Sequence, residues 1–216
     1  MHKYIVMRAQ NYGKGTQARM LQKAIPGLVH ISVGDIFRWH MANHTKLAAR
    51  IHRITSAGNL VDDEIVEEIV KHRLGTHDWN YGFVLDGFPR SRHQAEFFLE
   101  SFDIDAVIHI VVSDEVVHKR VMSRRLCSGC GLDYNLIYHR PAEDGICDVC
   151  GAPLESRIDD TPEALSTRLK EYHEKTEPVL NLFRRKELVL DVDGEKDSEH
   201  IHAQICEMLK LSSLAK

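Results

Sequence analysis

Residues 4–17 read YIVMRAQNYGKGTQ and predict an apolar strand, a tight loop and a helix that begins at Lys14. Backbone N–H groups and the positive end of the helix dipole meet at such a junction, and the lysine adds a full charge, so the segment suits a polyphosphate. A surface turn with a chance Gly-Lys-Gly is the alternative. The phosphate-loop pattern normally begins with glycine and places Ser or Thr after the lysine, whereas this chain has Arg8 and Gly15 there.

The composition describes one main domain without a general affinity for polyanions. The 216 residues are 43% hydrophobic, which is enough for one sizeable core with small inserted lobes. A formal charge of -4, from 28 basic and 32 acidic residues, gives no attraction to nucleic acid or membrane, so we expect neither as a partner. No apolar run approaches the roughly 18 residues of a membrane span, and the N-terminus does not resemble a signal peptide. We therefore expect a cytoplasmic protein.

Four of the five cysteines form two C-x2-C pairs, namely Cys127 with Cys130 and Cys147 with Cys150. In a chain without an export signal this spacing indicates a tetrahedral thiolate site for zinc, with iron or cobalt as substitutes. Two disulfides or unrelated thiols are the alternatives. Cys206 lies at helical spacing from Ile201 and Leu209, which predicts a small buried thiol.

Strands and helices alternate after the loop, which is typical of an α/β fold with a parallel sheet covered by helices. The expected strands are 83–85, 106–112 and 188–190. The expected helices follow caps at Asp62, Ser113 and Thr161, the second running over 116–125, and Pro178 should kink or end the third. A mostly helical stretch, 32–61, and the cysteine stretch, 126–160, break the alternation. We expect these to be two small lobes, with the core made from 1–31, 62–125 and 161–216.

Asp86 ends an apolar strand and is followed by Gly-Phe-Pro-Arg. A carboxylate at the carboxyl end of a parallel strand stands where such sheets bind ligands, and it can hold Mg2+ through water. An ordinary turn at the end of a strand is the alternative reading.

Arginines supply a second signal, since Arg120 and Arg124 would share one helical face and others flank loop-to-helix junctions. Each could be a solvated surface residue. Several guanidiniums near one anion site are what phosphoryl transfer needs, because its charge must be stabilised and its oxygens positioned. The further candidates are Arg38, Arg90, Arg157 and Arg168.

Taken together, these stretches resemble the adenylate kinase family in its long bacterial form with a zinc-binding lid. The resemblance covers nearly the whole chain. Its residues are 13–17, 34–38, 57–61, 86–90 with Gln94, Arg124 with Arg125, the four cysteines, and 157–160 with Arg168 and 171–173.

The resemblance implies a P-loop fold of three layers, in which a parallel sheet is flanked by helices, with an AMP-binding lobe at 32–61 and a zinc lid at 126–160. It implies a monomeric enzyme that transfers a phosphoryl group reversibly from ATP to AMP, giving two ADP, with Mg2+ held through water by Asp86 and a structural Zn2+. Residues implied to contact ATP are Asn11, Tyr12, Gly13, Lys14, Gly15, Thr16, Arg120, Arg124, Asp133, Tyr134 and Lys196. Residues implied to contact AMP or the transferred group are Val33, Arg38, Asn59, Leu60, Val61, Gly87, Phe88, Pro89, Arg90, Gln94, Arg157 and Arg168. The implied catalytic residues are Lys14, Arg90, Arg124, Arg157 and Arg168.

The chain departs from the family pattern in the loop and beside the acceptor base. Arg8 and Asn11 stand where the family has glycine, Tyr12 where it has a small residue, and Val33 where it usually has threonine. These departures leave three alternatives: a nucleotide-binding paralogue with little turnover, a kinase for another nucleoside monophosphate, and a zinc-ribbon module that binds nucleic acid.

Overall fold

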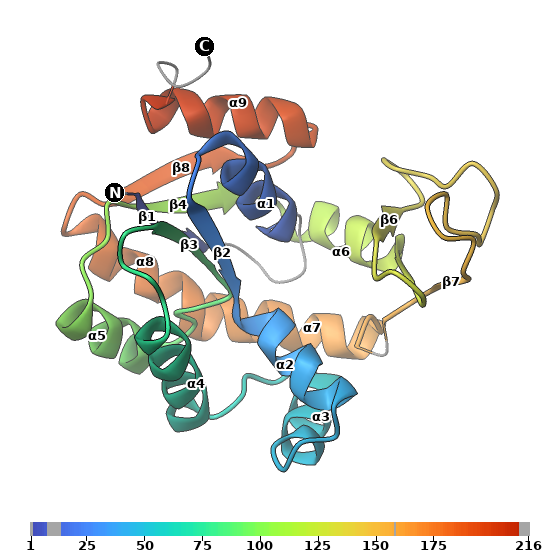
Figure 1. The fold of residues 1–216 in the computed structure, drawn as a ribbon, viewed down its shortest axis with the longest axis horizontal. Helices are drawn as coiled ribbons and strands as arrows, with labels where there is room; N and C mark the ends of the chain where they lie inside the picture. Colours follow the sequence, from blue (N-terminus) through green and yellow to red (C-terminus); the bar gives the residue numbers. More distant parts are fainter. Residues whose placement is uncertain (1, 8–13, 158, 212–216) are drawn as a thin grey trace.

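The centre of the molecule is a parallel sheet built from short apolar segments. The computed structural model describes residues 2–7, 14–157 and 159–211, without the side chain of Lys14. The expectations for Arg8, Asn11, Tyr12 and Gly13 therefore lie outside the described residues. Within them, the sheet has the order β2-β3-β1-β4-β8, and all its pairs are parallel. Its strands are β1 (Lys3–Met7), β2 (Leu28–Ser32), β3 (Gly82–Asp86), β4 (Ala106–Val111) and β8 (Val189–Asp193) (Figure 1).

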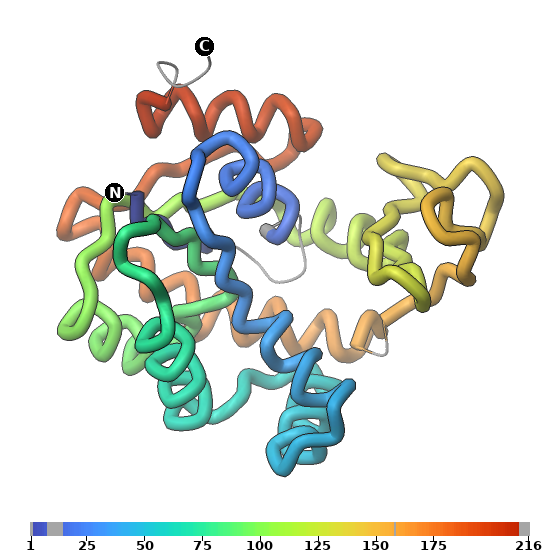
Figure 2. The backbone as a smooth tube through the Cα atoms, in the orientation of Figure 1, coloured from blue at the N-terminus to red at the C-terminus, as the bar shows by residue number. Residues whose placement is uncertain are grey.

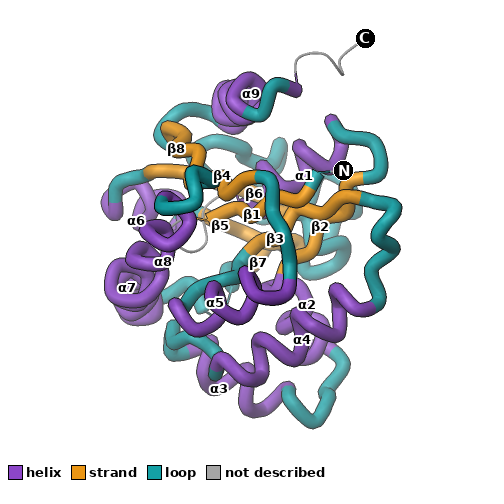
Figure 3. The backbone as a smooth tube through the Cα atoms, turned by 90° about the vertical axis from the view of Figure 1, so that its left-hand side faces the viewer, coloured by secondary structure: helices purple, strands orange, loops and turns teal. Residues whose placement is uncertain are grey.

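Helices cover both faces of this sheet, because alternate side chains of each strand point to opposite sides. Tyr4 and Val6 pack in one core with α1 (Lys14–Ala24) and α9 (Ser198–Met208). Ile5 and Met7 pack in a second core with α4 (Asp63–Gly75), α5 (Arg92–Ser101) and α8 (Glu177–Arg184). Figure 3 shows α9 on one side of the strands and α4 and α5 on the other. The predicted α/β fold of three layers is confirmed.

The stretch 32–61 forms two helices, α2 (Val33–Ala42) and α3 (Ala48–Ser56). Ser32 caps α2, accepting a hydrogen bond from the backbone N–H of Asp35. After α3 the chain passes close to α7 (Pro162–Glu171) at Gly58, which has a φ of 83°. A Cβ atom there would lie 2.4 Å from the carbonyl oxygen of Ala164, so only glycine fits this approach.

The cysteine stretch forms a small antiparallel sheet that follows α6 (Asp114–Met122). Its strands are β5 (Arg124–Cys127), β6 (Asp133–Asn135) and β7 (Leu154–Glu155), in the order β6-β5-β7. Figures 1 and 2 show this sheet at one end of the molecule, connected to it through α6 and α7. We call it the lid, and we call α2 with α3 the acceptor lobe; the exact domain boundaries remain predictions.

One expectation about these elements was wrong, and two hold with changes. The helix expected over 116–125 ends at Met122, and Arg124 pairs with Asn135 in the lid sheet, so Arg120 and Arg124 share no helical face. Asp62 and Ser113 occupy the N-cap positions of α4 and α6, as expected, but neither side chain makes a capping hydrogen bond. The Ser113 hydroxyl instead donates to Glu195 at 2.8 Å.

Two other expectations about helices hold with changes. Thr161 caps α7, and Pro162 stands in its first turn. The interruption expected at Pro178 falls earlier, in a π-helical turn, η1 (Tyr172–Thr176), and the proline stands in the first turn of α8. Strand β2 was not expected. Among the described helices, none combines the length and apolar character needed to cross a bilayer.

Candidate functional site

Two cavities lie beyond the carboxyl ends of the sheet strands, and they share one wall. The first, of about 440 Å³, lies between the first turns of α1, α6, the lid and the 196–198 segment. The second, of about 420 Å³, is enclosed by the acceptor lobe, α4 and the lid. The lining residues common to both are Gly34, Arg38, Gly87, Arg90 and Arg157. Two ligands seated in the cavities would therefore meet at a wall that carries three guanidiniums.

At its outer end the first cavity has a flat cationic surface. Arg120 donates to the carbonyl oxygens of Gly194 and Glu195 at 3.3 and 3.1 Å, and its guanidinium carbon lies 4.5 Å from the centre of the Tyr138 ring. Asn135 fixes this arrangement, since its amide donates to the Arg120 carbonyl and its oxygen accepts from the Tyr138 N–H. Tyr138 is a site residue that sequence reasoning missed, because only the fold of the lid brings it to Arg120.

The inner end of the first cavity is formed by the start of α1 and the end of β3. Gly15 and Thr16 line it, and Lys14 begins the helix, so backbone N–H groups point into the cavity. Asp86 is buried there, with Oδ2 3.7 Å from His30 Nε2. Its register partner on β2 is Ser32, which also lines the cavity. An anion held by the helix and a cation held by the carboxylate would be neighbours.

Two arginines at the base of the lid are fixed by neighbouring carboxylates. Arg124 donates through Nε and Nη2 to the two carboxylate oxygens of Asp160 at 2.8 and 2.5 Å. Arg168 is 3% exposed; it donates to the carbonyl of Asp159 at 2.7 Å, to its carboxylate, and to the carbonyl of Thr55 at 3.3 Å. The sequence indicated these carboxylate partners, since Asp159 and Asp160 follow Arg157 with one residue between them.

The guanidiniums on the shared wall are close enough together for the charge of one to lower the pKa of another. Burial lowers the pKa of Arg90 to about 10; Asp86 opposes this shift, and the charges of Arg168 and Arg38 add to it. Burial likewise lowers the pKa of Arg157 to about 10, helped by Arg124 and Arg38. Both remain cations at neutral pH. Because like charges are crowded here, an anion bound at the wall would relieve their repulsion.

The second cavity joins an apolar slot to this charged wall. Val33, Phe37, Met41, Leu60 and Val61 supply apolar surface, and Asn59, Arg38 and Gln94 supply polar groups. The side-chain oxygen of Gln94 accepts from the Arg90 N–H at 2.8 Å, and its amide donates to Asp63 at 2.7 Å. Such a slot suits a flat ring, with a phosphate at the wall.

Some predicted contacts lie elsewhere. Phe88 and Pro89 are buried and line neither cavity, although Gly87 and Arg90 beside them line both. Tyr134 lines the first cavity, but its hydroxyl donates to Cys147 and accepts from the Asp148 N–H. The Lys14 side chain, with Asn11, Tyr12 and Gly13, lies outside the described residues.

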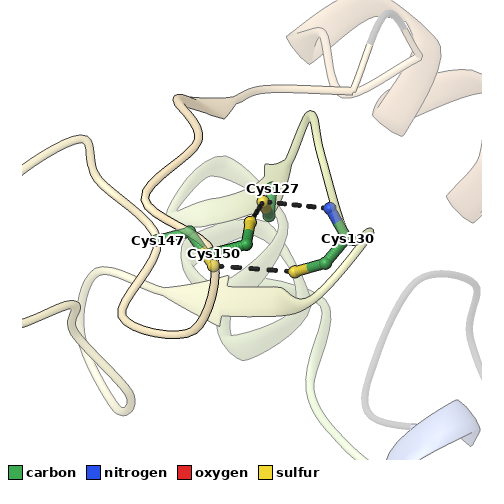
Figure 4. A group of neighbouring side chains, drawn as sticks. All are labelled: Cys127, Cys130, Cys147 and Cys150. Carbon is green, nitrogen blue, oxygen red and sulfur yellow. Dashed lines mark hydrogen bonds between the residues drawn. The ribbon is translucent and has the colours of Figure 1, made fainter.

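The four lid cysteines converge, with all their sulfur atoms within 4.8 Å of one another (Figure 4). All are free thiols, so the disulfide alternative does not describe this structure. Backbone N–H groups of Gly129 and Cys130 donate to the Cys127 sulfur, each at 3.3 Å. The hydrogen bond from Tyr134 lowers the pKa of Cys147 to about 6. Four thiolate donors in one tight cluster fit Zn2+.

Cys206 is separate from that cluster. Its thiol is only partly buried, contrary to expectation, and lies 3.5 Å from His202 Nε2 on the same helix. Its side chain packs at the margin of the core that contains α1 and α9.

Comparisons with known proteins agree with this geometry. The family model described as "Adenylate kinase" matches residues 6–188. The chain is 43% identical to an adenylate kinase of Archaeoglobus fulgidus over 89% of this chain and 91% of that protein. It is 40% identical to one from Caldicellulosiruptor saccharolyticus over 89% and 92% of the two chains, and 39% identical to one from Bacillus pumilus over 95% and 96%.

Proposed function

The chain belongs to the adenylate kinase family and is a nucleoside monophosphate kinase; we propose that its two cavities hold ATP and AMP while a phosphoryl group passes between them. The observation that carries this proposal is the wall shared by the cavities, where Arg38, Arg90 and Arg157 face both. In the forward direction an oxygen of the AMP phosphate bonds to the γ-phosphorus of ATP, and the bond from that phosphorus to the β,γ-bridging oxygen breaks. Two ADP result.

The first cavity suits the donor. The N-terminus of α1, with Gly15, Thr16 and the preceding loop, would hold the phosphates, and Lys14 would add its charge. Arg120 would lie against the base, beside Lys196. Arg124 is held by Asp160 at the same cavity, in position to bind phosphate oxygens.

The second cavity suits the acceptor. Its apolar slot would hold the AMP base, with Asn59, Leu60 and Val61 on one side and Gln94 on the other. Arg38 and Arg90 would hold the AMP phosphate at the shared wall. Val33 presents no hydrogen-bond donor or acceptor in its side chain, so main-chain groups and Gln94 would have to distinguish adenine from other bases.

The arginines would act mainly on the transition state. During phosphoryl transfer, negative charge spreads over the moving group, and preorganised guanidiniums stabilise it without reorienting. Arg90, Arg157 and Arg168 are buried or nearly so, which strengthens this effect. The lid would exclude water, which competes with AMP for the phosphoryl group.

Two metal ions fit residues of this chain. The buried Asp86 carboxylate lines the donor cavity and would hold Mg2+ through water. That ion would neutralise charge on the phosphate oxygens. Cys127, Cys130, Cys147 and Cys150 would hold Zn2+, which joins the strands of the lid.

A coupled assay that follows ADP formation from ATP and AMP tests the function. We expect ATP and AMP to be consumed in equal amounts as ADP forms. We also expect AMP to be preferred over CMP, GMP and UMP. Protein that binds ATP but makes no ADP with any of these acceptors would contradict the proposal. Gel filtration and cell fractionation would test the expected monomer and its cytoplasmic location.

A further inference from the structure

A carboxylate from the lid stands inside the donor cavity. Asp133 lies on β6, and its side chain faces two guanidiniums from different parts of the chain. Its Oδ1 is 3.4 Å from Arg157 Nη2, and its Oδ2 is 3.7 Å from Arg19 Nη1. Arg19 belongs to α1, the helix that opens at the phosphate loop. Asp133 therefore connects the lid to the core through its contact with Arg19, and it also contacts Arg157 near the end of the lid.

Building on the proposed function, we propose that Asp133 is a positioning residue that holds Arg157 in the donor cavity until ATP arrives, and that the ATP phosphates replace its carboxylate on Arg157. The family resemblance implies that Asp133 contacts ATP, whereas in this proposal its carboxylate competes with ATP for Arg157. An ionised carboxylate accepts hydrogen bonds and donates none, as do phosphate oxygens. Asp133 and the triphosphate therefore need the same donors.

The surroundings of Arg157 favour such an exchange. Its side chain is 14% exposed. Burial lowers its pKa, the nearby charges of Arg124 and Arg38 add to that shift, and Asp133 and Asp159 oppose it. Removing one carboxylate without a replacement would leave crowded guanidiniums less neutralised. A phosphate supplies the replacement. The Arg157 Nε–H is buried and has no hydrogen-bond partner among the described residues, so the present arrangement leaves one donor of this guanidinium unsatisfied.

The Asp133 contacts are of the kind that can be exchanged. At 3.4 and 3.7 Å they are longer than an ideal charge-assisted hydrogen bond. The Asp133 and Arg19 side chains are 39% and 50% exposed, so the pair between them is a weak surface interaction. ATP would thus displace Asp133 at a modest cost, which appears as weaker ATP binding.

Replacing Asp133 with Asn tests this cost, because the amide keeps the size of the side chain and removes its charge. We expect the dissociation constant for ATP, titrated without AMP, to fall about fivefold. The KM for ATP should fall with it, by a larger factor than kcat or the KM for AMP changes. Asp133→Glu, which keeps the charge, should bind ATP as the unmodified protein does. Asp133→Ser provides a second neutral variant should the Asn variant fail to fold.

Glu143→Gln is the matched control. It removes one negative charge from an exposed lid position that lines neither cavity, and it should leave ATP binding unchanged. Raising the salt concentration should shrink the difference between the unmodified and Asp133→Asn proteins, since screening weakens charge repulsion. Equal or weaker ATP binding by the neutral variants would overturn the proposal. Protein that binds ATP without making ADP would count against the proposed function alone, because the titration requires no turnover.

Discussion

Arg124 and Asp160 form a two-point ion pair in which both nitrogen donors of one edge of the guanidinium meet both carboxylate oxygens, at 2.8 and 2.5 Å. Asp160 also lies 3.7 Å from Arg168 Nη1, so one carboxylate orients two arginines. The side chains of Arg124 and Asp160 are 12% and 2% exposed. Two parallel hydrogen bonds fix the plane of the Arg124 guanidinium, and the single ammonium group of a lysine could not make this two-point contact.

Replacing Arg124 with Ala should therefore lower kcat by at least about a hundredfold, which corresponds to roughly 3 kcal/mol of transition-state stabilisation. Steady-state kinetics would measure the loss. Arg92→Ala is the control, since Arg92 is largely exposed and pairs with Glu96 along its own helix. Thermal unfolding of both variants would separate the loss of a catalytic charge from destabilisation caused by the loss of the Arg124 contacts to Asp160. Unaltered turnover in Arg124→Ala would remove this residue from the mechanism.

The lid should contain one zinc ion per chain. Structural zinc sites of this type gain on the order of 10 kcal/mol on binding, and the core of the lid consists of little more than Cys127, Tyr134 and Cys147. Chelation should expose the lid to proteolysis before the central sheet. Cys147→Ser should lose the metal, whereas Cys206→Ser, outside the cluster, should retain it. Protein purified without chelator that holds no metal and has disulfide-linked thiols would refute this prediction.

Glycine at positions 8 and 11 should tighten ATP binding and raise turnover. This prediction comes from the sequence, because both positions lie outside the described residues. Arg8 and Asn11 replace glycines that let the backbone approach phosphate closely, and Tyr12 adds further bulk. An ATP titration of Arg8→Gly/Asn11→Gly decides the question, with Lys14→Ala as the inactive control. Weaker binding would instead make Arg8 a phosphate ligand, worth about 1.5 to 3 kcal/mol.

Stability should depend on pH through Asp191, which accepts from His109 at 2.6 Å and from Arg184 at 3.0 Å. Burial acts to raise the pKa of Asp191, but these hydrogen bonds and charges hold it below its ordinary value. The stabilisation is therefore present above the unfolded pKa of about 3.9 and is lost as the pH falls through the folded pKa.

Asp191→Asn should lower the free energy of unfolding at pH 7 by about 1 kcal/mol or less, because this carboxylate is half exposed. Urea unfolding should show the difference from the unmodified protein shrinking as the pH falls below about 4. Asp103→Asn, at an exposed position, should show no such trend. A difference that stays constant down to pH 2 would show that the carboxylate charge is not its cause.

The sequence was sufficient for features that depend on local pattern. Alternating apolar runs predicted the parallel sheet, and the C-x2-C spacing predicted the cluster at Cys127, because each of these sequence signals is contained in short segments. The periodicity of the sequence wrongly predicted a helix at Arg124. Arg124 instead lies on a strand and pairs with Asn135, and helical periodicity gives no sign of such a strand partner. Strand β2 was missed because its sequence is partly polar and gives a weak strand signal. Its extended conformation is stabilised by pairing with β3. The meeting of Asp133 with Arg19 also requires the fold, since the two residues lie far apart in the chain.

One side chain, that of Arg168, joins the acceptor lobe to the end of the lid. Arg168 donates to Thr55 in the acceptor lobe and to Asp159 at the end of the lid, so its guanidinium joins two segments that line the second cavity, and the lid also lines the first. A nucleotide that draws this guanidinium toward its phosphate changes the free energy of both attachments. Thermodynamic linkage then requires a reciprocal effect: the factor by which ATP changes the affinity for AMP equals the factor by which AMP changes the affinity for ATP. We therefore expect synergy between the two substrates to reside in this hydrogen-bonded junction.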